Sequence, residues 1–152
     1  MKNMSYNRYR WSSSQQGVAA VEFALVVALF LTLLIGIMEM GRVLFYWNSA
    51  AEATRLGARM AVVCDLNDAD IKTRMQSRLG ILPANKINIG YEPDGCNADT
   101  CQYVTVSILS GVSVATILPF TPLALTLPPF STTLPRESMR STLTGLANPV
   151  CS

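Results

Sequence analysis

The chain has 152 residues, half of them apolar and only 14% charged, which suits a small domain with a membrane anchor better than an ordinary soluble protein. Its formal net charge of +2 comes from basic residues near the N-terminus, so the composition predicts no nucleic-acid partner. The sequence contains no histidine, the commonest general base and metal ligand, and no other pattern predicts an enzyme, a metal site or a cofactor.

Residues 1–16 are polar, basic and rich in Ser and Gln. Lys2, Arg8 and Arg10 precede the first apolar run without any acidic residue, which predicts a cytoplasmic N-terminus. We therefore expect residues 1–17 to be a cytoplasmic leader peptide.

An apolar run extends from Val18 to Met38 and is interrupted only by Glu22 and Thr32. Its length is close to the roughly 20 residues that a helix needs to cross a bilayer. It also exceeds the apolar region of about 7–15 residues in a secretory signal. We expect a transmembrane helix over residues 18–39. An uncleaved signal anchor is the alternative, and Glu22 weighs against it because a plain anchor gains nothing from a carboxylate in lipid.

The helical pattern continues beyond the apolar run. Glu52, Arg55 and Arg59 lie on one face, and Glu52 has the spacing of a helical ion pair with Arg55. We expect one helix over about residues 18–62, whose periplasmic part at 40–63 is amphipathic. The opposite face is apolar or small: Val43, Trp47, Ala50, Thr54, Gly57, Ala58 and Ala61.

Two details of this helix carry further expectations. Glu39 and Arg42 stand three residues apart at the level where lipid headgroups begin, so they can pair or be solvated there. The row of Ala50, Thr54 and Ala58 permits close backbone approach. We expect it to pack on the domain's own sheet in preference to a filament contact.

Residues 64–152 are expected to form a small α+β domain. Asn67 or Asp68 is expected to cap a second helix over residues 69–79. The acidic run here lacks the Gly and Glu positions of an EF-hand loop, so capping is favoured over calcium binding. Alternating apolar and polar residues predict strands over 86–91 and 102–108, with the sheet continuing over 112–118.

Four prolines between Pro119 and Phe130 argue against a central strand or a stable helix there. We expect an irregular segment, either packed across the core or exposed as a contact surface. Residues 138–147 are mostly polar and are expected to be weakly structured unless Cys151 ties them down.

Four cysteines behind a translocated segment predict an oxidising compartment and disulfides. Three pairings are possible. The short spacing of Cys96 and Cys101 in a turn-rich segment favours a bond between them, which leaves Cys64 to pair with Cys151 by elimination. On the chain-entropy model the longer loop would contribute about 4–5 kcal/mol, whereas the shorter one would stiffen the chain more than stabilise it.

Three short segments resemble a known family. Gly17-Val18-Ala19-Ala20-Val21-Glu22-Phe23 resembles the prepilin peptidase site of type IV pilin-like proteins. Glu39-Met40-Gly41-Arg42 and Ala53-Thr54-Arg55-Leu56-Gly57-Ala58-Arg59 resemble the TadE-like minor pseudopilins of the tight-adherence (Flp/Tad) pilus system. The resemblance implies a pilin-like α+β fold, with the long N-terminal helix packed on a small antiparallel sheet. It also implies that the proline segment is a covered crossover before a last strand at residues 131–134.

The resemblance implies cleavage after Gly17 by a prepilin peptidase, with Gly17, Val18, Glu22 and Phe23 as the processing site. Cleavage would free the α-amine of Val18, which can neutralise Glu22 of a neighbouring subunit. The expected partners are therefore the peptidase, other pilins or pseudopilins through the N-terminal helix, the inner-membrane assembly platform and membrane lipid. The expected location is the bacterial inner membrane, with the C-terminal domain in the periplasm; incorporation into an extracellular pilus stays open.

These expectations describe a non-enzymatic minor pseudopilin that takes part in pilus assembly, adhesion and biofilm formation. One alternative is an unprocessed single-pass periplasmic adhesin or interaction module, which would keep its leader. Another is a minor pseudopilin of a type II secretion system, which would share the cleavage site.

Overall fold

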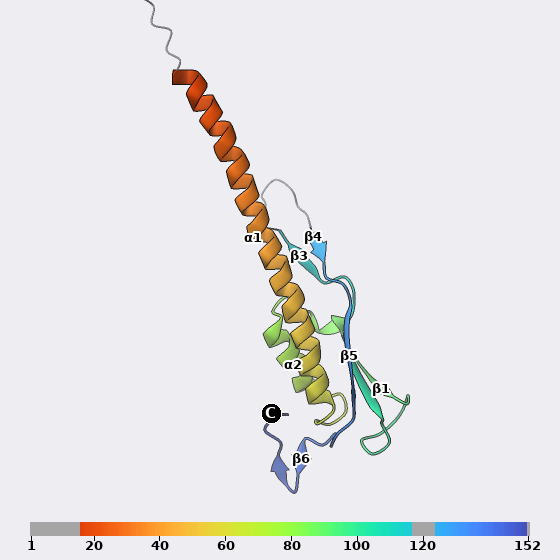
Figure 1. Cartoon of the computed structure of the whole chain (residues 1–152). Helices are drawn as coiled ribbons and strands as arrows, with labels where there is room; N and C mark the ends of the chain where they lie inside the picture. The colour runs from red at the N-terminus through yellow and green to blue at the C-terminus, as the bar shows by residue number, and fades with distance from the viewer. Residues whose placement is uncertain (1–15, 117–123, 152) are drawn as a thin grey trace, which may run out of the picture. The chain divides into compact units, whose positions relative to one another are not determined.

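The structure is a computed structural model that describes residues 16–116 and 124–151 (Figure 1). The chain divides into two compact units, Met1–Met38 and Glu39–Ser152. Helix α1 (Gln16–Ala61) runs through the boundary between them. The long N-terminal helix expected from the sequence is confirmed, and each unit is described separately below.

The described part of the first unit is the apolar half of α1, and its side chains are almost all exposed. Val18, Phe23 and Leu29 each expose 70% or more of their surface. By its length and composition α1 can cross a membrane. Such a surface is stable only if lipid or other helices cover it.

The second unit is an α+β arrangement, as the sequence predicts. It contains the later turns of α1, helix α2 (Ala69–Arg78), the short 3₁₀ helix η1 (Ala84–Lys86) and a three-stranded sheet. The sheet comprises β1 (Ile87–Glu92), β2 (Tyr103–Ile108) and β5 (Phe130–Pro135), in the order β1-β2-β5 with antiparallel pairing throughout.

Strand β2 alternates between a buried and a more exposed face, as its sequence pattern requires. Val104, Val106 and Ile108 are buried, whereas Thr105 lies on the other face. The hydroxyl of Thr105 is 2.9 Å from that of Thr133 on β5, a polar cross-strand pair on the outer face. The inner face of the sheet therefore contributes to the core.

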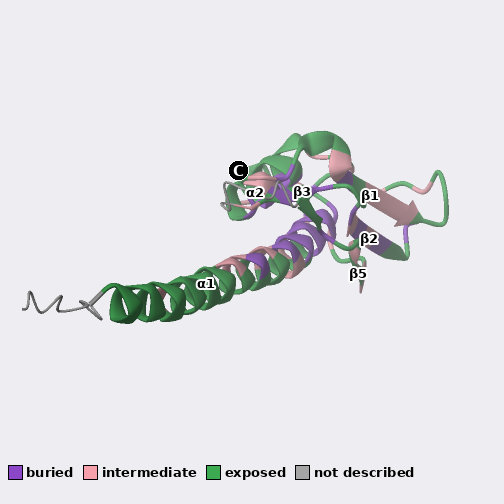
Figure 2. Ribbon diagram, turned by 90° about the horizontal axis from the view of Figure 1, so that it is seen from above, coloured by how far each residue is buried: buried purple, intermediate pink, exposed green. Residues whose placement is uncertain are grey.

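The second half of α1 also contributes to the core, and Figure 2 shows burial concentrated in its later turns. Ala50, Thr54 and Ala58 are buried, so the small-residue row packs within its own domain as expected. A Cβ added to Gly57 would lie 2.5 Å from Sδ of Met75 and 3.1 Å from Cγ1 of Val106. Gly57 therefore sets how closely α1 approaches α2 and β2.

Polar contacts also hold α1 in place. The hydroxyl of Thr132 donates to that of Thr54 across 3.2 Å, and Thr54 donates to the carbonyl of Ala51. On the opposite face Glu52 and Arg55 form the expected ion pair at 2.7 Å. One residue of the predicted buried face is misplaced: Trp47 is 42% exposed, because only a narrow stripe of α1 is covered at this level.

Helix α2 begins where the sequence predicts, with Asp68 as its N-cap accepting from the backbone N–H of Asp70. The helix ends at Arg78, one residue earlier than expected. Its buried residues Ile71 and Met75 face the core.

The sequence expectation for residues 112–130 is wrong in two respects. Strand β3 (Ser113–Ala115) does not extend the main sheet; it pairs with β4 (Ala124–Thr126) in a separate two-stranded sheet. The expected irregular segment therefore contains a strand, and that strand is exposed rather than covered. Residues 117–123 lie outside the described residues. Gly111, at φ 91°, redirects the chain ahead of β3.

The tail over residues 138–147, expected to be weakly structured unless Cys151 ties it down, is tied down by the bond between Cys64 and Cys151. Strands β6 (Thr142–Leu143) and β7 (Leu146–Ala147) form a small hairpin, so Ser131–Leu134, which lies inside β5, is not the last strand. Met139 is fully buried. The tail satisfies carbonyls that the end of a helix leaves free: the backbone N–H groups of Met139 and Arg140 donate to Val62 and Val63 at 3.2 and 2.7 Å.

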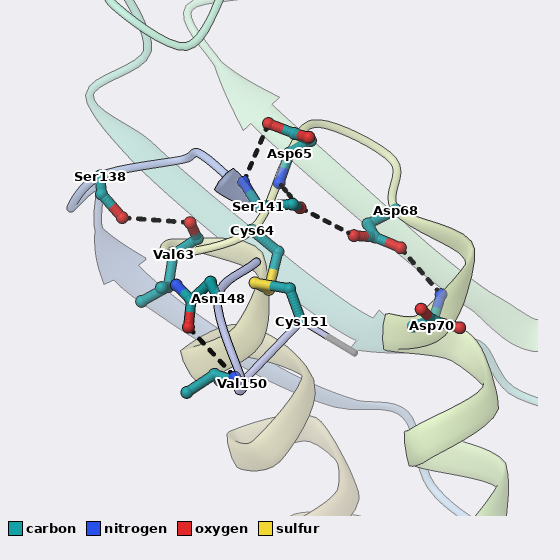
Figure 3. Close-up of a disulfide and its surroundings, with 10 residues drawn as sticks. All are labelled: Val63, Cys64, Asp65, Asp68, Asp70, Ser138, Ser141, Asn148, Val150 and Cys151. Carbon is teal, nitrogen blue, oxygen red and sulfur yellow. Dashed lines mark hydrogen bonds between the residues drawn. A yellow bond between two sulfur atoms is a disulfide. The ribbon is translucent and has the colours of Figure 1, made fainter. Parts of the chain in front are cut away.

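Two disulfides are present, which confirms the expectation of disulfides. Cys64 is bonded to Cys151, 87 residues further along, and Cys96 to Cys101. The first bond fastens the C-terminal segment to the turn that follows α1 (Figure 3). Around it, Ser141 donates its backbone N–H to Asp65 and its hydroxyl to Asp68. The acidic residues considered for calcium thus serve as hydrogen-bond acceptors between segments.

Candidate functional site

The residues predicted to form a processing site lie at the start of α1. Gly17 is in the first turn, and an added Cβ there would meet no atom within 4 Å. Val18 is 72% exposed and Phe23 70%. Packing among the described residues therefore explains none of these three residue types.

Glu22 lies one helical turn after Val18, so the two side chains share a face of α1. Its side chain is exposed, and among the described residues the structure gives it no hydrogen-bond or ion-pair partner. Side chains in a helix lean toward its N-terminus, which directs the carboxylate of Glu22 toward the first turn. The structure places Gly17, Val18, Glu22 and Phe23 along the first two turns of one helix.

A second charged group stands in the first turns of the second unit. The guanidinium of Arg42 pairs with the carboxylate of Glu39 at 2.9 Å. The pairing confirms the expectation for these residues. The same guanidinium donates to the backbone carbonyl of Ala115 on β3 and lies 6.0 Å from the ring centre of Tyr46. Sequence reasoning missed the contact with Ala115, because the two residues lie 73 positions apart and no local pattern connects them.

The exposed fractions of this pair are small, 12% for the Glu39 side chain and 25% for that of Arg42. An ion pair that is mostly shielded from water contributes more than an exposed one only when its remaining polar atoms have partners. The carbonyl of Ala115 provides such a partner. The charged pair therefore acts as a tie between α1 and the β3–β4 sheet.

Comparison with known protein families gives one result. Residues 17–59 match the family model described as TadE-like protein. The chain is TadE-like over its N-terminal helix. The match associates the chain with the Tad pilus system, whose TadE-like members are structural components. No curated protein and no solved structure matches the chain significantly.

The TadE-like segment begins at Gly17 and ends at Arg59, two residues before the end of α1. It therefore includes the four residues of the predicted processing site, the Glu39–Arg42 pair and Gly57. The sheet, α2 and both disulfides lie outside it. The roles of Gly17, Val18, Glu22 and Phe23 stay predictions.

Proposed function

We propose that the chain is a minor pseudopilin of a Tad/Flp-type pilus, processed by a prepilin peptidase and active in pilus assembly, adhesion and biofilm formation. The observation that carries the proposal is the TadE-like match, which starts at the glycine that opens an exposed apolar helix. This position coincides with the cleavage site inferred from the sequence.

The first step is hydrolysis of the peptide bond between Gly17 and Val18 by a separate peptidase. An added Cβ at Gly17 would meet no atom within 4 Å, so packing within the chain does not require glycine here and recognition by a protease can be the reason for it. The first turn of a helix lacks intrahelical acceptors for its N–H groups and opens at low cost. Glycine adopts the extended backbone that a protease binds more readily than it keeps a helix.

The second step is recognition between subunits. Hydrolysis leaves a positively charged α-amine on Val18, one turn from the unpaired carboxylate of Glu22. In lipid each charge is costly alone, and pairing removes much of that cost. Pairing between subunits fixes the axial register of neighbouring helices, because only one offset brings an amine to a carboxylate.

The proposed layout follows from these steps. Residues 1–17 form a cytoplasmic leader, 18–39 the transmembrane helix, 40–63 its periplasmic continuation and 64–152 the globular domain. The partners are the prepilin peptidase, other pilins or pseudopilins, the inner-membrane assembly platform and lipid. The disulfides support a periplasmic domain, because such bonds persist in oxidising compartments.

The direct test is the intact mass and N-terminal sequence of the protein purified from its native membranes. The expected N-terminus is Val18. A protein that keeps residues 1–17 would contradict processing and favour the unprocessed anchor. A chain cut at Gly17 but recovered with secretion components instead of pilus components would favour the type II alternative.

The second step is tested with Glu22→Gln, which removes the charge and keeps the size of the side chain. Cross-linking to partner subunits should fall by about a hundredfold or more, because an unpaired charge in a buried site costs about 3–5 kcal/mol. Glu52→Gln is the matched control, since Glu52 is an exposed carboxylate on the same helix with its own arginine. If Glu22→Gln assembles as well as Glu52→Gln, the amine–carboxylate pairing is wrong.

A further inference from the structure

The apolar exposed surface of α1 continues into the second unit, beyond the residues expected to mark the membrane edge. Met40, Leu44, Phe45 and Trp47 expose 62%, 48%, 65% and 42% of their surface. All four follow Glu39, where the sequence places the end of the apolar run. Large apolar side chains in successive helical turns indicate a surface that something else covers.

The charged pair does not interrupt this surface, because it lies on a different side of the helix. Arg42 contacts the carbonyl of Ala115 on β3, and the neighbouring Val43 is buried. A helix turns by about 100° per residue, which places Met40 roughly opposite Arg42. Glu39 and Arg42 are thus turned toward the domain, and their charges neutralise each other there.

The apolar arc is also too wide for one partner helix. Helical geometry spreads the side chains from Trp47 through Met40 and Leu44 to Phe45 over about 160°, an arc that also contains the exposed Asn48. The seam between two packed helices is a narrower stripe. A medium that surrounds the helix covers such an arc, and lipid is that medium for the preceding turns.

The residue types of this surface lead to the same partner. Met40, Leu44, Phe45 and Trp47 all follow Glu39 within eight residues, a little over two helical turns. Tryptophan is a residue type enriched at membrane interfaces, where its ring lies at the level of the headgroups.

The β3–β4 sheet lies at the same level, because Arg42 binds Ala115 directly. Ala115 pairs with Ala124, and the next residue of β4, Leu125, is 38% exposed. The described strands of this sheet contain no charged residue. Figure 1 shows β3 and β4 beside α1, so the sheet adds apolar surface next to the helix.

We propose that Met40, Leu44, Phe45 and Trp47, together with Leu125 of β4, bind the headgroup layer of the membrane that α1 crosses. The partner is lipid, and the site is a collar that holds the first turns of the second unit against the bilayer surface. This inference rests on the proposed membrane insertion of residues 18–39.

The test uses tryptophan fluorescence of the full chain in vesicles of phosphatidylcholine and phosphatidylglycerol. The sequence contains two tryptophans, so Trp11→Phe leaves Trp47 as the reporter. Trp47 should lose roughly half its emission when the lipids carry a quencher near the headgroup, because an interfacial indole lies within its reach. Emission that is unchanged by the quencher would overturn the proposal.

Three further reporters, each introduced into the Trp11→Phe, Trp47→Phe background, separate the possible failures. Leu29→Trp reports on the membrane span, Leu125→Trp on the β4 contact, and Leu146→Trp on a residue of β7 that is 74% exposed. The first should be quenched by deep labels, the second by shallow labels and the third by neither.

Failure of Leu29→Trp to respond would refute membrane insertion itself. Quenching of Leu29→Trp without quenching of Trp47 would refute only the collar. Absence of quenching at Leu125→Trp would show that β4 is not part of it. Dilution of the protein in lipid identifies the partner. Quenching that persists on dilution supports lipid, whereas a Trp47 that becomes water-exposed on dilution indicates a second copy and overturns the proposal.

Discussion

The two halves of α1 are parts of the same helix, yet their residue types answer to different constraints. In the first half the large side chains are exposed, and Glu22 has no partner among the described residues. In the second half Ala50, Gly57 and Ala58 are small because the sheet and α2 lie against them. Packing within the described chain thus does not account for the large side chains of the first half, whereas the domain's own core accounts for the small residues of the second.

The sharpest way to break this comparison is Gly17→Ala. We expect processing by the peptidase to be slowed severely or abolished, because the motif is local, while the stability of the domain stays unchanged. The ratio of precursor to mature mass measures the first effect, and thermal unfolding measures the second. Gly36→Ala, at another glycine of the same helix with open space around it, should be processed normally. Normal processing of Gly17→Ala would remove this residue from the argument.

For the disulfide that closes the longer loop we expect the opposite: its removal should change the stability of the domain and leave processing unchanged. Replacing both Cys64 and Cys151 by Ala should lower the free energy of unfolding by about 4–5 kcal/mol, because the loop spans 87 residues. Cleavage after Gly17 should persist.

The matched control is removal of Cys96 and Cys101, which lie only 5 positions apart. On the same chain-entropy model this change costs about 2 kcal/mol. Equal losses for the two double variants, measured by denaturant unfolding, would contradict the entropic account.

Replacing two glycines of α1 by alanine should change the stability of the domain by smaller amounts and in opposite directions. Gly57→Ala should destabilise the domain by about 1–2 kcal/mol, since the new methyl group would overpack the buried Met75 and Val106. Gly41→Ala should stabilise it by up to about 1 kcal/mol, because Gly41 has open space around it and alanine favours the helix. If both substitutions stabilise, α1 is not held closely by the core.

The smallest effect concerns pH. Burial raises the pKa of Tyr91 above its ordinary value of 10.0; the hydrogen bond from the backbone of Asn67 opposes this rise, and the charge of Asp68 adds to it. The folded state therefore keeps the phenol proton longer than the unfolded state does. The protonated phenol of Tyr91 therefore makes its full contribution to stability below about pH 10, and this contribution is lost as the pH rises through the pKa of the folded state.

Unfolding measured between about pH 9 and 11 checks this prediction. Tyr91→Phe should lose stability with rising pH less steeply than the native chain. Its stability at neutral pH should also be lower, because the 2.9 Å bond between the Asn67 N–H and the hydroxyl is gone. Tyr103→Phe is the control, because Tyr103 is 48% exposed; an equal change of slope in both variants would refute the role of burial.

Local patterns predicted the parts of the fold that depend on neighbours in sequence. The helical repeat predicted α1, alternation predicted β1 and β2, and Asp68 marked the start of α2. The residues of the candidate site also come from one short linear segment, Gly17 to Phe23, and their roles stay predictions.

Contacts between distant segments could not be predicted in this way. Prolines argued against a central strand and predicted an irregular segment, yet β4 lies between two of them and pairs only with β3. The tail looked polar, yet the carbonyls at the end of α1 are its partners, and a sequence does not show that these are near. Trp47 fits the helical repeat of the buried face, but the repeat does not give the width of that face.

The bond between Cys64 and Cys151 has a consequence for biosynthesis. Cys64 is made first and its partner last, while Cys96 and Cys101 emerge in between. At about 5–20 residues per second, Cys64 waits roughly 4–17 s for its partner. Oxidation in order of appearance would join Cys64 to Cys96 and trap a misfolded subunit. Correct maturation of this chain therefore requires either delayed oxidation or an isomerase that reshuffles early bonds.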